Sequence, residues 1–306
     1  MENMFKKVIL TGATGFIGKV FTKKLLSEGT KVIAIVPDPE NLEDVAQENL
    51  KVVKARFEDF DKLTDYIEKD DYDVFFHIAW AGYGKTTNDY KAQISNIKPS
   101  CDALTAAAEL GCKRFLFTSS FSEYMTQVTD TKKHNDDATC NVYGSTKHAT
   151  RLLLQAIALQ KNISFVSIAF SNTYGPGDRS NRSTNLFINR LLAGQDLDLT
   201  PGTALYDWNY IDDSIEGLSL AAEKGKDNEL YYIFGNGIRP LKEIVSDVRD
   251  IINPECKINL GTYKEDFGVD YSSVDIYKLY RDTGYYPRTD FKQSIINTAE
   301  WLKSIK

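Results

Sequence analysis

The chain has 306 residues, 42% of them hydrophobic and 26% charged, so it is long enough for an α/β domain with a buried core and an appended lobe. Its net charge of −6 comes with mixed signs and no cluster of lysine or arginine, which argues against a nucleic-acid partner. The first residues contain no long apolar run and no stretch approaches membrane-spanning length, so we expect a cytoplasmic protein with no membrane partner.

The first half of the chain alternates short apolar runs with amphipathic helical patterns. Strands are predicted over 6–12, 31–36, 50–55, 73–80, 113–120 and 163–170, and helices over 18–29, 93–111 and 143–161. The apolar runs are almost continuous, which indicates strands buried on both faces, as in a parallel sheet. The alternation of strands and helices predicts an α/β fold with a doubly wound, Rossmann-type sheet.

After about residue 171 the pattern becomes less regular. A loop rich in Gly, Asn, Ser and Arg spans 172–185, and it is followed by helices near 186–193, 212–224 and 240–252 and a strand over 230–235. We therefore expect residues 1–170 to form the Rossmann domain. Residues 171–306 should form mainly a smaller substrate-binding lobe, from which segments such as strand 230–235 return to the sheet.

Metal chemistry is not expected. Cys101, Cys112, Cys140 and Cys256 are widely spaced, with no Cys-x-x-Cys pair and no histidine beside them, which argues against zinc and against a disulfide framework. His77 stands alone, and we interpret it as a packed or hydrogen-bonded core histidine.

A glycine-rich turn joins the first strand to the first helix. In TGATGFIG (11–18), Gly12 allows a tight turn, Gly15 lets the backbone approach a pyrophosphate, and Gly18 permits close packing of helix on strand. The helix that follows supplies amide donors and the positive end of its dipole. Within a βαβ unit, this pattern predicts a dinucleotide cofactor.

Five further segments follow in a recognisable order: HIAWAG (77–82), the helix and strand over 96–120, YGSTK (143–147), SNTYGPGD (171–178) and WNYIDD (208–213). Over nearly its whole length the chain resembles the extended short-chain dehydrogenase/reductases of the NAD(P)-dependent epimerase/dehydratase family. The resemblance implies an enzyme that modifies a nucleotide-diphosphate sugar, with a homodimer as a possible assembly.

Tyr143 and Lys147 are four residues apart and share one face of the predicted helix. A free tyrosine has a pKa near 10, and a neighbouring cation is expected to lower that pKa towards neutrality. The resemblance gives Tyr143 the role of acid/base and gives Lys147 that of also holding the nicotinamide ribose. It makes Ser120 the hydroxyl that orients the substrate oxygen.

Positions 121 and 122 bear on the reaction. In the family's 4,6-dehydratases an Asp-Glu pair stands there and eliminates water, which needs an acid and a base. This chain has Phe121 and Ser122, and Glu123 comes one position later, where alternation along an extended segment would aim it at the other face. Dehydratase activity is therefore not expected.

The resemblance implies cofactor contacts along most of the first domain. The residues are Gly12, Thr14, Gly15, Phe16, Ile17, Val36, Arg56, Phe57, Ala79, Trp80, Ala81, Asn96, Thr118, Tyr143, Lys147 and Phe170. Val36 occupies the position of the acid that binds the ribose of NAD, and Arg56 stands where the family often has an aspartate. This tilts the expectation from NAD towards NADP(H), although a solvated charge at the end of a strand explains Arg56 equally well.

The substrate contacts implied are Ser120, Phe121, Ser122, Asn172, Arg179, Arg182, Asn185, Leu186 and Tyr206. Arg179 and Arg182 suit phosphate oxygens, although loop arginines are as often only solvated. Many relatives carry an arginine where this chain has Tyr206, which puts the usual diphosphate clamp in doubt.

The leading hypothesis is a 4-ketoreductase of a nucleotide-linked 4-keto-6-deoxyhexose. One alternative is a nucleotide-sugar 4-epimerase, which uses the same three residues but retains its NAD. Another is a non-catalytic dinucleotide-binding regulator, against which the intact Ser120, Tyr143 and Lys147 speak.

Overall fold

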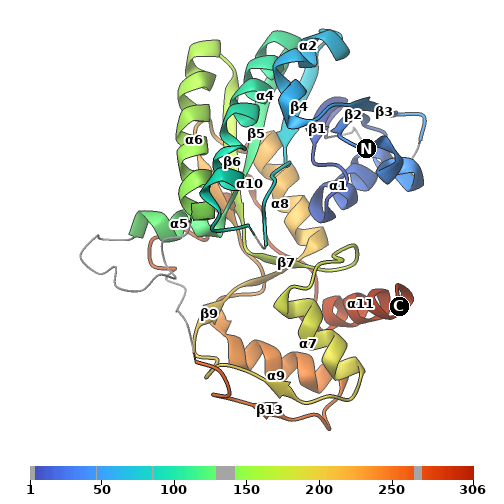
Figure 1. Cartoon of the computed structure of the whole chain (residues 1–306), viewed down its shortest axis with the longest axis vertical. Coiled ribbons are helices and arrows are strands. Elements are labelled where there is room, and N and C mark those ends of the chain that lie inside the picture. Colours follow the sequence, from blue (N-terminus) through green and yellow to red (C-terminus); the bar gives the residue numbers. More distant parts are fainter. Residues whose placement is uncertain (1–3, 46, 85, 129–141, 265–270) are drawn as a thin grey trace.

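The central sheet of the computed structural model contains seven parallel strands, and the structure describes residues 4–45, 47–84, 86–128, 142–264 and 271–306. The strands are β1 (Lys7–Thr11), β2 (Lys31–Val36), β3 (Leu50–Lys54), β4 (Tyr72–His77), β5 (Cys112–Ser120), β6 (Ser164–Phe170) and β11 (Leu230–Ile233). Their order is β11-β6-β5-β4-β1-β2-β3, and every neighbouring pair is parallel. Figure 1 labels the strands from β6 to β3 in this sheet. The predicted Rossmann-type α/β fold is confirmed, and the strand expected over 230–235 does join the sheet.

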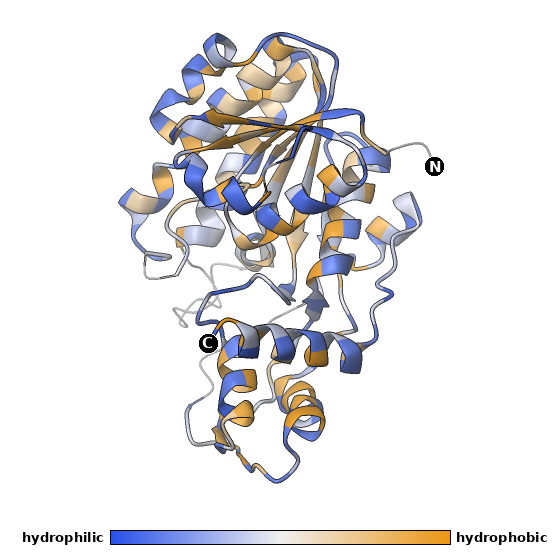
Figure 2. Cartoon of the chain, turned by 90° about the vertical axis from the view of Figure 1, so that its right-hand side faces the viewer, coloured by the Kyte–Doolittle hydropathy of each residue, from blue (hydrophilic) through white to orange (hydrophobic). Residues whose placement is uncertain are grey.

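Helices cover both faces of this sheet. Three of them, α2 (Leu63–Tyr66), α4 (Ile97–Leu110) and α6 (Val142–Lys161), lie on one face, while α1 (Phe16–Ser27), α8 (Ile211–Lys224) and α10 (Lys278–Thr283) lie on the other. Figure 2 shows the apolar strands nearly edge-on between these layers. Strands covered on both faces need apolar side chains on both, which explains the unbroken Val, Ile and Phe runs of the sequence.

The smaller part of the molecule is mainly helical. It contains α7 (Ser183–Leu192), α9 (Leu241–Ile252) and α11 (Phe291–Ser304), which pack against one another (Figure 1). Three short strand pairs accompany them: β7 (Asn172–Tyr174) with β10 (Trp208–Tyr210), β8 (Leu197–Asp198) with β13 (Ile258–Asn259), and β9 (Leu205–Tyr206) with β12 (Arg239–Pro240). At two or three residues a strand, these pairs are too short to give a periodic signal in the sequence.

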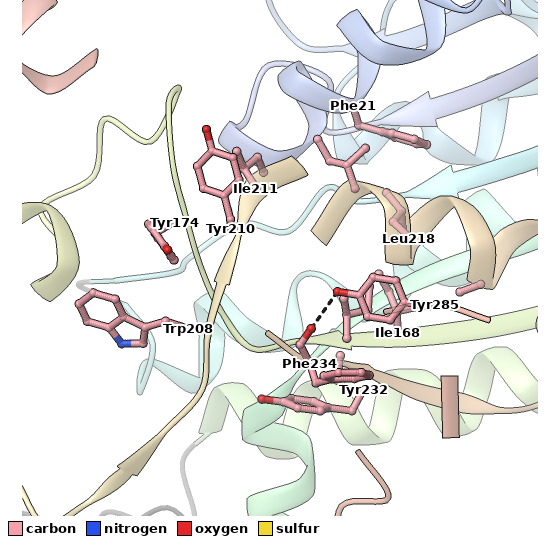
Figure 3. Packing of buried hydrophobic residues seen from close by; sticks show 14 of the residues in the cluster. Phe21, Ile168, Tyr174, Trp208, Tyr210, Ile211, Leu218, Tyr232, Phe234 and Tyr285 are labelled. Atoms are coloured by element: carbon pink, nitrogen blue, oxygen red, sulfur yellow. Dashed lines mark hydrogen bonds between the residues drawn. The ribbon is translucent and has the colours of Figure 1, made fainter. Parts of the chain in front are cut away.

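One apolar cluster continues from the sheet into the smaller part. Phe21 on α1 and Leu218 on α8 belong to the same buried cluster as Trp208 on β10. Figure 3 shows these side chains together, with the hydroxyl of Tyr285 donating to the carbonyl of Phe234 at 2.8 Å. A separate cluster lies between the sheet and the α4–α6 layer.

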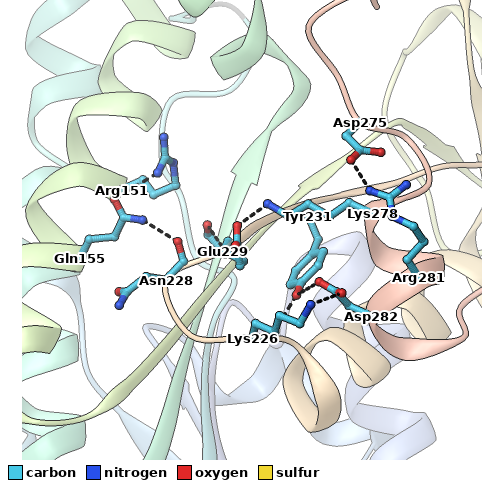
Figure 4. A network of polar contacts seen from close by, with 11 residues as sticks. Arg151, Gln155, Lys226, Asn228, Glu229, Tyr231, Asp275, Lys278, Arg281 and Asp282 are labelled. Atoms are coloured by element: carbon cyan, nitrogen blue, oxygen red, sulfur yellow. Dashed lines mark hydrogen bonds and ion pairs between the residues drawn. The ribbon is translucent and has the colours of Figure 1, made fainter.

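A polar network ties α10 and the β11 segment to the rest of the sheet (Figure 4). Lys278 pairs with Glu229, and Asp282 accepts hydrogen bonds from Lys226 at 2.5 Å and from the Tyr231 hydroxyl at 2.8 Å. Gln155 of α6 donates to the carbonyl of Asn228 at 2.9 Å. Contacts from three elements therefore fix the edge of the sheet at β11.

The structure differs from the sequence expectation over 93–111. In place of one helix there are two, α3 (Tyr90–Ile94) and α4, separated at Ser95 and Asn96. The Asn96 amide donates to the carbonyls of Ala92 and Gln93 at 3.1 Å, so a side chain takes the place of backbone partners at the break.

Cys101, Cys112 and Cys256 are free thiols, and Cys140 lies outside the described residues. Among the described helices, none combines the length and apolar character needed to cross a bilayer.

Candidate functional site

A cavity of about 520 Å³, here called the glycine-loop cavity, lies at the carboxyl ends of β1 and β4. The sheet order reverses at β1, and ligands of open α/β sheets bind at such a switch point. The predicted residues that line it are Gly12, Thr14, Gly15, Phe16, Ile17, Arg56, Phe57, Ala79, Trp80 and Ala81. Gly18 and Arg182 also line it, and the wall is completed by residues that sequence reasoning did not assign to the cofactor: Ile35, Pro37, Ala55, Glu58, Phe60 and Ile78.

Glycine stands at each of these three positions of the loop for a different physical reason. A side chain at Gly12, which has a φ of +80°, would bring its Cβ to 2.7 Å from the Ala79 nitrogen. At Gly18 the Cβ would lie 2.0 Å from the Gly12 oxygen. At Gly15 it would meet only that oxygen, at 3.5 Å, so the surrounding protein does not require glycine there.

Gly15 instead leaves space in front of the first turn of α1, at the lining of the cavity. It is the N-cap of α1 and makes no side-chain cap, so the amides of that turn remain available. An open cradle beside free amide donors and the positive end of a helix fits the diphosphate of a dinucleotide.

Val36 does not line this cavity, contrary to the sequence expectation. Its side chain is buried in the cluster on the α1 side of the sheet. Successive side chains of a strand point to opposite faces, so the cavity receives the neighbours Ile35 and Pro37. Arg56 does line the cavity; its guanidinium is 3.7 Å from the Asp38 carboxylate, and both side chains are exposed.

A second cavity of about 220 Å³, the tyrosine cavity, adjoins the first, with which it shares Ile17, Ile78, Trp80 and Arg182. The predicted Thr118, Ser120, Tyr143, Lys147 and Phe170 all line it. β5 ends at Ser120 and α6 begins at Val142, so the sheet edge and the helix present these groups to one space.

Tyr143 is buried, and its surroundings differ from the expectation. Burial raises the pKa of Tyr143 to about 12. A hydrogen bond from Ser120 and the charge of Arg182 act in the opposite direction and lower this pKa, but they do not offset burial. The prediction that Lys147 would bring this pKa towards neutrality is wrong for the protein alone, because desolvation exceeds the stabilising interactions.

Lys147 is fully enclosed. Its Nζ donates to the Thr118 carbonyl at 2.7 Å and lies 3.7 Å from the centroid of the Trp80 ring and 5.9 Å from that of Tyr143. Burial holds the pKa of Lys147 well below its ordinary value, and Glu123 opposes that shift. The Trp80 indole is fixed in turn by a 3.0 Å hydrogen bond to Gln93.

The segment after Ser120 is helical rather than extended, so the alternation assumed for Glu123 does not apply. α5 (Phe121–Val128) starts at once, and the Ser122 amide donates to the Ser120 hydroxyl at 3.2 Å. The Phe121 ring packs 4.7 Å from that of Tyr271. Glu123 is buried, where it pairs with Arg151 and accepts a hydrogen bond from Ser119.

Two predicted asparagines brace the backbone instead of lining either cavity. Asn96 accepts from the Ala81 amide at 2.7 Å and so holds the loop after β4. Asn185 donates to the carbonyls of Asp178 and Ser180 at 2.7 and 2.9 Å, which fixes the loop before α7.

Other predicted substrate residues do not line either cavity. Asn172 and Leu186 are exposed, Tyr206 packs against the apolar cluster, and Phe121 and Ser122 are not part of the lining. Arg179 lines a different cavity, beside Lys19 and Lys23 of α1.

His77 is a core residue, as expected. Its ring nitrogens lie 2.9 Å from the hydroxyls of Thr11 and Ser100. Burial, together with the charge of Lys147, lowers the pKa of His77 to about 3.

Sequence reasoning missed Tyr83, an exposed residue that lines the tyrosine cavity. Its ring is 5.4 Å from the Tyr143 ring and carries the guanidinium of Arg182 at 5.1 Å. A single tyrosine in a loop has no pattern that distinguishes it from an ordinary exposed side chain.

Comparison with known proteins places this geometry in a family. Residues 8–233 match the model of the NAD dependent epimerase/dehydratase family. The chain is 24% identical to Protein CapI of Staphylococcus aureus, with 96% of this chain and 98% of that protein covered. It is 25% identical to a dTDP-glucose 4,6-dehydratase of an Actinoplanes species, over 97% of this chain and 98% of that protein.

Among solved structures, a UDP-N-acetylglucosamine 4-epimerase from Methanobrevibacter ruminantium superposes with a TM-score of 0.82 at 21% identity, covering both chains completely. At that identity the match shows a shared fold.

Proposed function

The chain belongs to the NAD-dependent epimerase/dehydratase family, and from this premise we propose that it is an NAD(P)-dependent reductase of a nucleotide-diphosphate-linked 4-keto-6-deoxyhexose. The observation that carries the proposal is the tyrosine cavity, where Ser120, Tyr143 and Lys147 meet beside the glycine-loop cavity. This arrangement supports redox chemistry at one carbon that bears oxygen.

The residues of the chain have distinct tasks in this reaction. Tyr143 donates its phenolic proton to the substrate oxygen, and Ser120 holds that oxygen by a hydrogen bond. The chemistry expected of bound NAD(P)H is delivery of a hydride to the carbonyl carbon. Because burial raises the pKa of Tyr143 to about 12, its phenol is protonated at neutral pH, which is the form that a reductase needs.

Water elimination is not part of the proposal. It would need an acid and a base at the hydroxyl-bearing end of β5, where Phe121 and Ser122 stand. Glu123 pairs with Arg151 and is committed to that contact. The 4-keto substrate must therefore come from a separate dehydratase.

A nucleotide-sugar 4-epimerase is the second candidate, because a solved 4-epimerase shares the fold over the whole chain. An epimerase must keep its ketone intermediate bound while the sugar ring rotates to present its other face to the cofactor. By the family resemblance, Tyr206 takes the position of an arginine that binds the diphosphate, so we infer that this hold is weaker here. We therefore favour the reductase over the epimerase as the function of this chain.

The deciding experiment supplies NDP-hexoses before and after treatment with a 4,6-dehydratase, each with NADPH or NADH. We expect the nicotinamide absorbance to fall stoichiometrically only with the treated sugars, and Tyr143→Phe to abolish turnover while dinucleotide affinity changes little. Interconversion of untreated sugars without net cofactor use would establish the epimerase instead. Dinucleotide binding without turnover of any NDP-sugar would point to the regulator.

A further inference from the structure

The cavity that Arg179 lines, here called the cationic cavity, lies between α1 and the loop that precedes α7. Its volume is about 380 Å³, and its lining includes three basic side chains: Lys19 and Lys23 of α1 and Arg179 of the loop. It shares residues 14–16 with the glycine-loop cavity and no lining residue with the tyrosine cavity. The cationic cavity therefore borders the dinucleotide cradle but is separate from the catalytic side chains.

The two lysines carry charge that α1 itself does not favour. Lys19 and Lys23 are four residues apart on one face of the helix, and like charges at this spacing repel each other. The first turn of α1 contains no acidic residue, so no carboxylate in that turn offsets the positive end of the helix dipole. Both ammonium groups pair with the same carboxylate, that of Asp44, at 2.6 and 3.4 Å. Two cations that share one carboxylate leave one positive charge in excess.

Arg179 adds a second positive charge. Among the residues that the structure describes, its exposed side chain forms no ion pair and no hydrogen bond. The backbone on either side is fixed, because Asn185 donates to the carbonyls of Asp178 and Ser180 at 2.7 and 2.9 Å. At Gly177, whose φ is +103°, a Cβ would lie 3.3 Å from a side chain of α1, so the loop packs closely on the helix. The backbone that carries the arginine is thus in place before any ligand binds, which lowers the entropic cost of binding.

These groups suit a phosphate better than a carboxylate. A guanidinium binds phosphate oxygens in pairs, and lysine supplies a compact positive charge. A phosphate monoester carries a charge of about −1.5 to −2 at neutral pH, which matches the two excess positive charges, whereas a carboxylate carries only one negative charge. Thr14 and Asn41 complete the lining with polar side chains.

We propose that the cationic cavity is a binding site for a phosphate monoester, held by Lys19, Lys23 and Arg179. Two sources carry such a group. One is the extra phosphate of NADPH, because the cavity borders the glycine loop; the other is a separate phosphorylated small molecule. In both cases the phosphate binds outside the tyrosine cavity, so the site governs which ligand is bound and takes no part in proton transfer.

The first test titrates the full chain with inorganic phosphate in a calorimeter, at constant ionic strength and without dinucleotide. We expect Arg179→Gln and Lys23→Gln each to weaken the binding of phosphate roughly tenfold, because each removes a charged donor. Lys24→Gln is the matched control: Lys24 lies on the same helix but pairs with Glu28 and does not line the cavity, so the affinity should hold. Wild-type affinity in both Arg179→Gln and Lys23→Gln would overturn the proposal, as would an equal loss in Lys24→Gln.

The second test repeats the phosphate titration with saturating NADH or NADPH. Displacement of phosphate by NADPH alone assigns the site to the extra phosphate of that cofactor, and Arg179→Gln should then lower the ratio of NADPH to NADH affinity roughly tenfold. Phosphate binding that persists with both dinucleotides assigns the site to a separate phosphorylated molecule. Displacement by both would show that the part common to the two dinucleotides fills the cavity, which overturns the proposal.

Arg56 separates this site from the glycine-loop cavity. It lines that cavity but not the cationic one, so Arg56→Gln should leave the affinity for inorganic phosphate unchanged. A loss in Arg56→Gln equal to that in Arg179→Gln would place the phosphate in the glycine-loop cavity and contradict the assignment. Absence of phosphate binding by the wild type, with an unchanged ratio of NADPH to NADH affinity in Arg179→Gln, would also overturn it. None of these titrations uses a sugar, so their outcome is independent of the proposed reaction.

Discussion

The Nζ of Lys147 lies 3.7 Å from the centroid of the Trp80 ring, inside a site where burial works against its charge. Its other close partner is the Thr118 carbonyl at 2.7 Å. The ammonium is therefore held by an aromatic face and a carbonyl oxygen, with Glu123 acting from farther away. A desolvated cation–π contact contributes about 2 kcal/mol.

Loss of the Trp80 ring should thus neutralise Lys147 more easily. In Trp80→Leu we expect the pKa of Lys147, already held low by burial, to fall by about one further pH unit. Nitrogen NMR of the labelled lysine side chain measures this directly. Trp80→Phe keeps an aromatic face and should retain most of the effect; equal pKa values in both variants would show that the ring is not a partner of the charge.

Two glycines of the same loop should respond in opposite ways. Gly18→Ala places a Cβ 2.0 Å from the Gly12 oxygen, so the melting temperature should fall clearly. Gly15→Ala meets only that oxygen at 3.5 Å, so stability should hold while the dinucleotide dissociation constant rises at least tenfold. Thermal unfolding and calorimetric titration separate the two effects. Unchanged dinucleotide affinity in Gly15→Ala would remove the case for a diphosphate at this cradle.

His77 should make the stability of the protein depend on pH. Its pKa is about 3 when folded and near 6.5 when unfolded, so below pH 6.5 the unfolded chain binds a proton that the folded chain does not. The contribution of the neutral His77 ring to the free energy of unfolding is fully present above pH 6.5, and it decreases as the pH falls towards 3. Between pH 6.5 and 5 the loss amounts to at most about 2 kcal/mol.

Urea unfolding at several pH values tests this contribution. His77→Gln should flatten the dependence between pH 6.5 and 5. The matched variant Thr11→Val removes a 2.9 Å partner of His77 but keeps the titrating ring, so it should lower stability while retaining the slope. A slope in His77→Gln equal to that of wild type would contradict the assignment.

Arg56 should favour NADPH over NADH. Its guanidinium is exposed at the glycine-loop cavity and only 3.7 Å from Asp38. Arg56→Gln should weaken the binding of NADPH more than that of NADH. Asp38→Asn should strengthen the preference for NADPH, because it removes a carboxylate that competes for the Arg56 guanidinium. Calorimetry with both cofactors decides; tighter binding of NADH by the wild type would refute the prediction.

The sheet could be predicted closely from the sequence because strands covered on both faces leave unbroken apolar runs. β2 was expected over 31–36 and observed at Lys31–Val36. The break at Asn96 could not be predicted, since it depends on a side chain that bonds the loop after β4 as well as its own helix. Contacts between distant segments leave no local pattern.

The site was predictable in position but not in electrostatics. Helical spacing brought Tyr143 and Lys147 to one cavity, as expected. The pKa of Tyr143 depends on burial and on Ser120, Tyr83 and Arg182, and the pKa of Lys147 depends on burial and on Glu123, none of which lies on the same helix. The family resemblance also predicted a cofactor contact for Val36. The alternation of side chains along β2 instead directs the Val36 side chain into the apolar core.

The apolar cluster that joins Phe21, Leu218 and Trp208 has a consequence for how such a protein can be recombined. A chimera with a fusion point at residue 170 would separate β6 from β11 and would strip α8 from the sheet. A graft has to exchange the outward excursions of the chain between β6 and α8 and between β11 and α10, together with α11, which packs against both of them. The sheet can then remain constant while the sequence of those segments, and with it the ligand that they bind, varies.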